Sequence, residues 1–178
     1  MIITEIDSFI PSQMEKLFKN VLSHGLDPRP QINKLLPVLQ DWAFKLENYV
    51  DTGYNRNSVF KLDDNNEVVL ASWKKGQKTP FHFHTNQSCW IYMFKGSLEE
   101  IRLKSPSNFE LESGLRDWSS LSSIYEEQAS WFEVKNSKSV SLVHADSWNY
   151  IDDSLGFHQM SAATDEVLSL HIYRTLVI

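Results

Sequence analysis

The chain has 178 residues, of which 42% are hydrophobic and 22% are charged, a composition that can bury the core of one globular domain. Its formal net charge of −6 argues against a nucleic-acid binder, because phosphate recognition needs a basic face. The sequence predicts no membrane helix and no signal peptide, and one cysteine cannot form an internal disulfide. We therefore expect a protein of the reducing cytoplasm.

The first 50 residues carry the periodicity of amphipathic helices. Apolar residues recur at helical spacing over 14–22, and Gly25 is a suitable stop for that helix. A second apolar stripe covers 32–46, and Pro37 interrupts it, so the stripe forms either two short helices or one kinked helix. We expect a helical segment over residues 1–50.

Beyond residue 50 the pattern changes to short β-type runs that polar turns separate. The predicted strands are 58–62, 67–74, 81–84, 89–96, 97–103, 129–134, 139–145, 156–162 and 167–178. Many short strands at close spacing indicate a sandwich or barrel over residues 51–178. A Ser-rich stretch around 105–130 is weakly periodic and indicates a long loop or an inserted hairpin. We expect one domain over residues 1–178, with the helical segment packed on the β-structure.

Two histidines stand one residue apart in "PFHFH". On a strand, alternate side chains share a face, so His82 and His84 would point into one space, with Phe81 and Phe83 on the other side. Neutral imidazole is a common metal ligand, and this spacing suits two ligands. Two hydrogen-bonded histidines on a wet face are the alternative, and the pair by itself does not choose between these interpretations.

The surroundings of the pair resemble a cupin barrel. Gly76 and Pro80 precede the histidines, Gly96 marks a tight turn after them, and His158 follows another turn in "DDSLGFHQM". Cupins bind a metal inside a small β-barrel through two histidines of one strand and a third from a later strand. Many cupins add an acidic ligand shortly after the pair, where this chain has none. The resemblance therefore implies three neutral histidine ligands.

The last predicted strand, "EVLSLHIYRTLVI", has polar residues on one face. Ser169, His171 and Tyr173 are spaced by two and so share that face, which indicates a polar interior and hence a site. An exposed edge strand is the alternative, and Arg174 on the opposite face argues against it. The lone Cys89, taken by itself, is most simply a small buried hydrophobic residue.

Taken together, "PFHFHTNQSCW", "GSLEE", "DDSLGFHQM" and "SLHIY" resemble the cysteine dioxygenase family of thiol dioxygenases. That family is a cupin barrel (jelly roll) with an N-terminal helical segment, and it holds a mononuclear non-haem Fe(II) through three histidines. The resemblance implies that the ligands here are His82, His84 and His158. It also implies a thioether cross-link between Cys89 and Tyr173.

The same resemblance assigns further residues. Ser169 and His171 match the hydrogen-bonding pair that positions the catalytic Tyr173. "DTGYNRNSVF" resembles the strand that carries a carboxylate-binding arginine preceded by a tyrosine, here Arg56 and Tyr54. Members that act on 3-mercaptopropionate typically have a glutamine in place of this arginine. The resemblance therefore implies oxidation of L-cysteine by O2 to cysteine sulfinic acid, a reaction of L-cysteine catabolism.

Three alternatives stay open at this point. The first is a dioxygenase of another small thiol such as 3-mercaptopropionate, against which Arg56 argues. The second is a non-catalytic metal-binding cupin module, which has no need of Cys89 beside Ser-x-His-x-Tyr. The third is another metal cupin, such as an isomerase that uses Zn or Mn, because three histidines also suit those metals.

Overall fold

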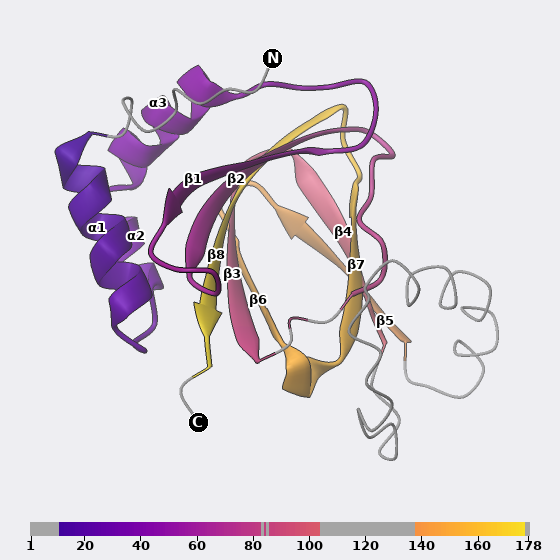
Figure 1. The fold of residues 1–178 in the computed structure, drawn as a ribbon. Helices are drawn as coiled ribbons and strands as arrows, with labels where there is room; N and C mark the ends of the chain where they lie inside the picture. Colours follow the sequence, from indigo (N-terminus) through magenta and orange to yellow (C-terminus); the bar gives the residue numbers. More distant parts are fainter. Residues whose placement is uncertain (1–10, 83, 85, 104–137, 177–178) are drawn as a thin grey trace.

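The computed structural model describes residues 11–82, 84, 86–103 and 138–176. Within them, helices come first and strands follow (Figure 1). The helices are α1 (Ser12–Ser23), α2 (Arg29–Asn33) and α3 (Leu36–Leu46). The strands are β1 (Asn55–Lys61), β2 (Glu67–Lys74), β3 (Gln87–Lys95), β4 (Ser97–Leu103), β5 (Lys138–His144), β6 (Trp148–Asp152), β7 (Phe157–Ala162) and β8 (Glu166–Thr175). None of these helices is long and apolar enough to cross a membrane.

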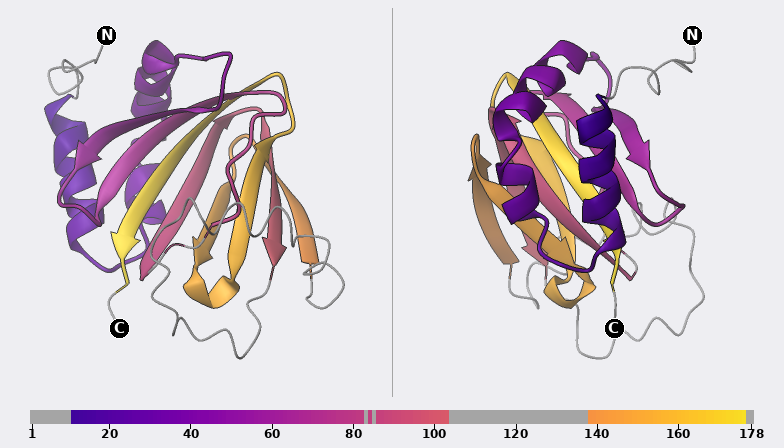
Figure 2. Two further views of the ribbon diagram at one scale, coloured as in Figure 1. Left: turned by 45° about the vertical axis from the view of Figure 1, so that its right-hand side comes forward. Right: turned by 90° about the vertical axis from the view of Figure 1, so that its left-hand side faces the viewer.

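The strands form two antiparallel sheets that face each other across the interior. The larger sheet has the order β1-β2-β8-β3-β6, and the smaller one has the order β5-β4-β7. The helices cover the outer side of the larger sheet (Figure 2). This arrangement confirms the predicted architecture, which is a mainly β barrel of the cupin type with N-terminal helices.

Strand β8 separates two cores because its side chains alternate between two faces. On the outer face, Leu170 and Ile172 are fully buried against the helices. On the inner face, Ser169, His171 and Tyr173 point into the space between the sheets. Since β8 pairs with both β2 and β3, it is a central strand of its sheet, and the edge-strand alternative is wrong.

The helical segment follows the predicted periodicity closely. The apolar positions of α1 are all buried, and the second apolar stripe forms two helices. Pro37 lies in the first turn of α3, where a missing N–H removes no helical hydrogen bond. At the C-terminal end of α1, the Arg174 guanidinium donates to the carbonyl oxygens of Val21 and His24, at 3.2 and 2.9 Å. This contact ties β8 to the helical layer.

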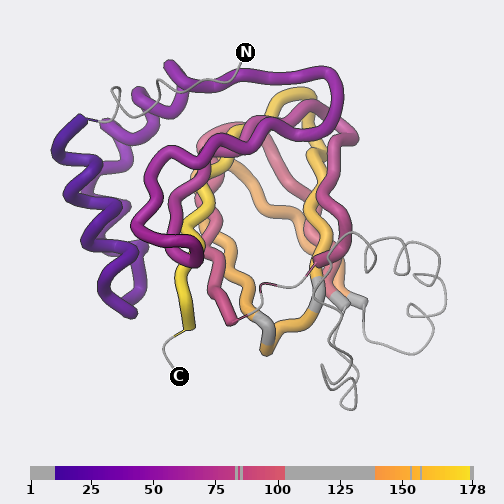
Figure 3. The backbone as a smooth tube through the Cα atoms, in the orientation of Figure 1, coloured from indigo at the N-terminus to yellow at the C-terminus, as the bar shows by residue number. Residues whose placement is uncertain are grey.

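The prediction of a strand over 81–84 is wrong. Residues 77–82 run beside β7 (Figure 3) but make only isolated bridges with it, at Lys78–Ser161 and His82–His158. Pro80 lies between these bridges and has no N–H to donate, so a continuous ladder cannot form. His82 and His84 therefore belong to the connection between β2 and β3.

Two further differences concern the strands. Strand β1 begins at Asn55 rather than at residue 58. The prediction missed its first three residues because they are polar and have the composition of a turn. Strand β6 was not predicted, since "WNYID" mixes aromatic and polar residues without a clear alternation. The predicted strand 129–134 and the stretch around 105–130 lie outside the described residues.

The turn predicted at Gly96 is confirmed, and it carries the chain from the larger sheet to the smaller one. Gly96 has φ +74°, in the left-handed region. A Cβ there would meet the main-chain oxygen of Glu166 and would lie 2.5 Å from Thr164 Oγ1 and 2.9 Å from Val167 Cγ2. Glycine is therefore required both for the backbone angle and for the space.

We expect Gly96→Ala to lower the free energy of unfolding by about 3 kcal/mol, because it combines a left-handed backbone angle with overpacking. Gly53→Ala is the matched control. Gly53 has a similar φ of +65°, but nothing lies within 4 Å of its Cβ position, so we expect a loss of only about 1 kcal/mol. Denaturant unfolding measures both variants, and equal losses would contradict the role of close packing.

Candidate metal centre and surrounding pocket

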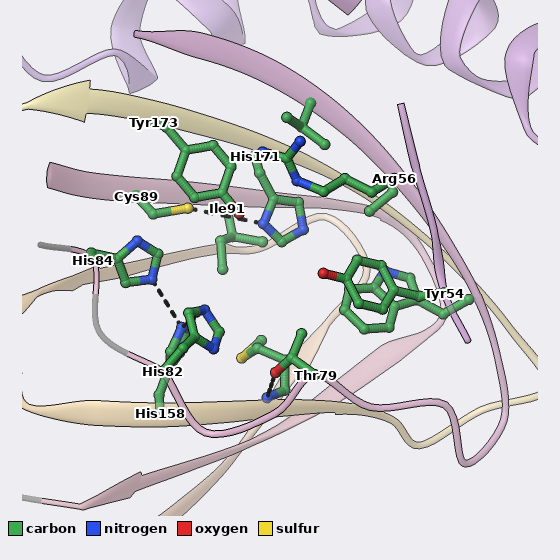
Figure 4. A pocket seen from close by; sticks show the side chains of 14 residues that line it. Tyr54, Arg56, Thr79, His82, His84, Cys89, Ile91, His158, His171 and Tyr173 are labelled. Atoms are coloured by element: carbon green, nitrogen blue, oxygen red, sulfur yellow. Dashed lines mark hydrogen bonds between the residues drawn. The ribbon is translucent and has the colours of Figure 1, made fainter. Parts of the chain in front are cut away.

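Three histidines converge in the space between the sheets (Figure 4). His158 comes from β7, and His82 and His84 come from the β2–β3 connection. The Nε2 atom of His158 lies 3.0 Å from Nε2 of His84 and 3.2 Å from Nε2 of His82. The structure thus brings together the three predicted ligands, although no strand carries the first two.

The outer nitrogens of two rings fix their tautomers. Nδ1 of His82 lies 2.9 Å from the carbonyl oxygen of Pro80, and Nδ1 of His158 lies 2.8 Å from Oε1 of Glu100. Both partners are acceptors, so each Nδ1 carries the proton and each Nε2 carries a lone pair. Two lone pairs that face each other at 3.2 Å repel, unless an electron-pair acceptor lies between them. A metal ion is such an acceptor.

The spacing of the nitrogens also fits a metal. Two nitrogens each about 2.1 Å from one ion lie about 3.0 Å apart if their bonds meet at a right angle, and about 3.4 Å apart in a tetrahedron. The His84–His158 separation of 3.0 Å matches the right-angle value, and the His82–His158 separation of 3.2 Å lies midway between the two. In either arrangement three protein ligands leave at least one position of the ion open.

The charge state of the histidines favours a cation as well. Burial lowers the pKa of His82 to about 4 and that of His84 to about 2, and the neighbouring histidines lower both further. Both imidazoles are therefore neutral near pH 7, the form that binds a metal. The donor set of neutral buried nitrogens thus fits a divalent metal ion.

The inner face of β8 supplies the second part of the site. Nε2 of His171 lies 2.9 Å from Oγ of Ser169, and that hydroxyl also accepts a hydrogen bond from Nε1 of Trp73, at 3.1 Å. The His171 and Tyr173 rings are stacked, with centroids 6.1 Å apart. Burial raises the pKa of Tyr173 well above its ordinary value, so the phenol keeps its proton.

Cys89 lies directly beside this tyrosine. Cys89 on β3 and Tyr173 on β8 are direct partners in the strand register, and the Cys89 side chain is fully buried. Opposite residues in an antiparallel pair have Cβ atoms only about 5 Å apart. Sγ also lies 3.9 Å from Nδ1 of His171, and burial raises the pKa of the thiol. The structure therefore brings together the two residues of the predicted cross-link.

Arg56 and Tyr54 lie at the edge of the pocket, with Arg56 beside Tyr173. Tyr54 stacks on Trp73 with ring centroids 4.2 Å apart. The Arg56 guanidinium lies 5.4 Å from the centroid of the Tyr173 ring. Its side chain is 38% exposed and forms an ion pair with Glu67. Arg56 thus lies at the rim of the pocket with an acidic partner of its own.

Three of the residues around the site did not emerge from the sequence. They are Trp73, which supports Ser169, Glu67, which pairs with Arg56, and Glu100, which accepts a hydrogen bond from His158. A signal existed for Glu100, since it alternates with the buried Leu98 and so places a charge on a core-facing position. Burial by itself would raise the pKa of Glu100, but hydrogen bonds from His158 and Asn149 hold it below its ordinary value.

All the predicted site residues except Ser169 line one pocket, and Ser169 lies directly behind it through His171. The unfilled space between the lining side chains measures about 360 Å³, including its opening to solvent. That volume is at the lower end of the range for small-molecule sites. The arrangement suits a small ligand between a metal position and a cationic rim.

A comparison with protein families matches residues 39–175 to the family described as "Cysteine dioxygenase type I". Among curated proteins, cysteine dioxygenase type 1 of Danio rerio is 25% identical over 136 residues, which cover 75% of this chain and 57% of the relative. The Homo sapiens protein of the same name is 26% identical over 137 residues, which cover 75% and 56%. The matched part thus spans little more than half the length of these relatives.

Among solved structures, an uncharacterized conserved protein with a double-stranded β-helix domain from Klebsiella pneumoniae aligns with a TM-score of 0.49. The alignment has 10% identity and covers 75% of this chain and 81% of the other.

We expect His171 to make stability pH-dependent. Burial lowers its pKa to about 3, with a further contribution from the charge of Arg56, whereas an unfolded histidine titrates near ~6.5. The folded state therefore binds fewer protons, so stability is complete above pH ~6.5 and falls as the pH drops toward 3. In metal-free protein, the free energy of unfolding should fall between pH 7.5 and 5, and His171→Gln should make this fall smaller by up to about 2 kcal/mol.

Denaturant unfolding at a series of pH values measures this effect. The natural sequence, unfolded under the same conditions, is the reference. Identical profiles for His171→Gln and the natural sequence would contradict the assignment of His171 as a neutral buried imidazole.

Proposed function

The chain belongs to the cysteine dioxygenase type I family of the cupin superfamily, and on this premise we propose that it oxidises L-cysteine with O2 to cysteine sulfinic acid. The observation that carries the proposal is the convergence of three Nε2 atoms beside the Cys89–Tyr173 pair, with Arg56 at the rim. Each of these groups has a separate use in thiol oxidation.

The proposed ligands of Fe(II) are His82, His84 and His158. Fe(II) would supply redox chemistry and open coordination positions for small molecules. Three neutral ligands leave the charge of a divalent ion uncompensated, which favours an incoming thiolate. The same buried surroundings keep bulk water away from the reacting sulfur.

Arg56 is the proposed receptor for the substrate carboxylate. A guanidinium has five N–H donors, and the ion pair with Glu67 uses Nη2. A carboxylate can therefore share the guanidinium with Glu67 or displace it. Tyr54, held against Trp73, would limit the space beside the bound substrate and so help to orient it.

Tyr173 is the proposed proton-bearing group beside the reacting atoms. Its phenol keeps the proton on Oη, so it can donate a hydrogen bond to a developing negative charge. His171 and Ser169 would hold the ring of Tyr173 in place through the contacts described above. The facing position of Cys89 supports a thioether cross-link to Tyr173, which would fix the ring covalently.

Oxidation of another small thiol, such as 3-mercaptopropionate, is the second candidate. The ion pair with Glu67 favours a wider choice of thiols, because an Arg56 that shares its charge with Glu67 depends less on the substrate carboxylate, which L-cysteine and 3-mercaptopropionate both carry. A non-catalytic metal-binding module and a metal-dependent isomerase would leave the Cys89–Tyr173 pair without a use.

The first experiment is product analysis with labelled oxygen. Protein loaded anaerobically with Fe(II) is mixed with L-cysteine and then exposed to ¹⁸O2, and the product is analysed by mass spectrometry. We expect cysteine sulfinic acid with two labelled oxygen atoms, and we expect none from His158→Ala. Peptide mapping of the same sample would detect the cross-link as a Cys89–Tyr173 peptide lacking two hydrogens. Iron-loaded protein that oxidises no thiol in a panel would point to a binding module.

The second experiment concerns thiol specificity. Arg56→Gln should reduce kcat/KM for L-cysteine roughly 10- to 100-fold, because a charge-assisted hydrogen bond is lost, and should shift the preference toward 3-mercaptopropionate. Lys61→Gln is the control, because it also removes a cation of β1 that forms an ion pair, here with Asp64, but lies away from the pocket. Glu67→Gln should lower KM for L-cysteine by freeing Arg56. An unchanged thiol preference in Arg56→Gln would argue against the choice of cysteine.

A further inference from the structure

Glu100 is a fully buried carboxylate on β4, and it is 0% exposed. It lies directly behind the histidine cluster, where Oε1 accepts the Nδ1–H of His158 at 2.8 Å. An isolated charge at such a position is strongly unfavourable, so its presence needs compensating partners. Those partners come from strands β4, β5, β6 and β7.

The second carboxylate oxygen is held from three other directions, the weakest of which is the hydroxyl of Ser141 on β5, which donates to Oε2 at 3.4 Å. Oε2 accepts a hydrogen bond from Nδ2 of Asn149 on β6, at 2.9 Å. It also lies 2.9 Å from Nε of Arg102, which is two residues further along β4 and is the register partner of His158. Arg102 is fixed in turn, because it donates to Oδ1 of Asn149 and to the carbonyl oxygen of Tyr150, at 3.0 and 2.6 Å. The carboxylate therefore has little freedom to move.

We propose that Glu100 is a positioning residue that holds His158 as its Nδ1–H tautomer, with Nε2 turned toward the metal position. The inference rests on the metal site of the proposed function. A carboxylate behind a ligating histidine orients the ring and strengthens the nitrogen as a ligand. The Nδ1–H of His82 donates to a neutral acceptor, the Pro80 carbonyl, whereas the Nδ1–H of His158 donates to the ionised carboxylate of Glu100.

The network also connects the two sheets. Asn149 belongs to the larger sheet, whereas Glu100 and His158 belong to the smaller one. The position of the His158 ring therefore depends on contacts from both sheets. The carboxylate accepts a hydrogen bond only from the Nδ1–H form, so its position selects that tautomer.

The test compares metal affinity in full-length protein without using turnover. Metal-free protein is titrated anaerobically with Fe(II) against a chromophoric chelator. Glu100→Gln keeps the shape but removes the charge, and we expect binding of one ion per chain with affinity about 10- to 100-fold weaker. Glu99→Gln is the matched control, because Glu99 is the neighbouring residue on β4 and points to the other face. Its affinity should equal that of the natural sequence.

Two further measurements separate positioning from a structural role. The unfolding midpoints of metal-free Glu100→Gln, Glu99→Gln and the natural sequence should be similar. A loss of metal affinity in Glu100→Gln would then not be a consequence of lower stability. Long-range ¹H–¹⁵N NMR spectra of the metal-free natural protein should show the His158 proton on Nδ1, a measurement that does not require any variant to fold.

The outcomes are distinct. Unchanged affinity in Glu100→Gln would overturn the inference while leaving the proposed function intact. An affinity loss matched by an equal loss of stability, or a His158 proton on Nε2, would also overturn it. If the natural sequence binds no Fe(II), both the metal site of the proposed function and this inference fail.

Discussion

The two-sided character of β8 is the constraint on which the rest of the structure depends. Its even and odd positions face different environments, so one strand must satisfy a hydrophobic helical layer and a polar pocket at once. A slip of one residue would exchange these faces and would place His171 against the helices. Pairing with β2 on one side and β3 on the other fixes the register in two independent ways.

The interior of the barrel stays stable because its polar groups satisfy one another. Buried polar atoms are costly unless they have hydrogen-bond partners. Here Ser169 connects Trp73 with His171, and Glu100 connects His158 with Asn149. The Nε2 lone pairs of His82 and His158 face each other at 3.2 Å, and this local conflict is what a cation would resolve.

Much of this could be predicted from the sequence. Helical and alternating periodicities are local properties, so the helices, most strands and the polar face of β8 follow from them. The ligand set depended on motif resemblance, and the structure brings those histidines together. The expected strand over 81–84 failed because Pro80 breaks the ladder that the alternation suggested. The contacts of Arg56 and Glu100 could not be predicted, because Glu67 lies on the neighbouring strand and Asn149 lies on the facing sheet, so both become neighbours only in the folded barrel.

The contact between Arg174 and the end of α1 has a consequence for how this chain can be divided. Arg174 is the residue next to Tyr173, and its guanidinium occupies the carbonyl groups that terminate α1. Removal of the helices would leave a cation without acceptors at the end of the strand that carries the tyrosine, and would expose Leu170 and Ile172 to water. The barrel is therefore not an autonomous module to which helices were added. A minimal fragment that keeps this pocket, or a graft of the pocket onto another scaffold, has to include α1.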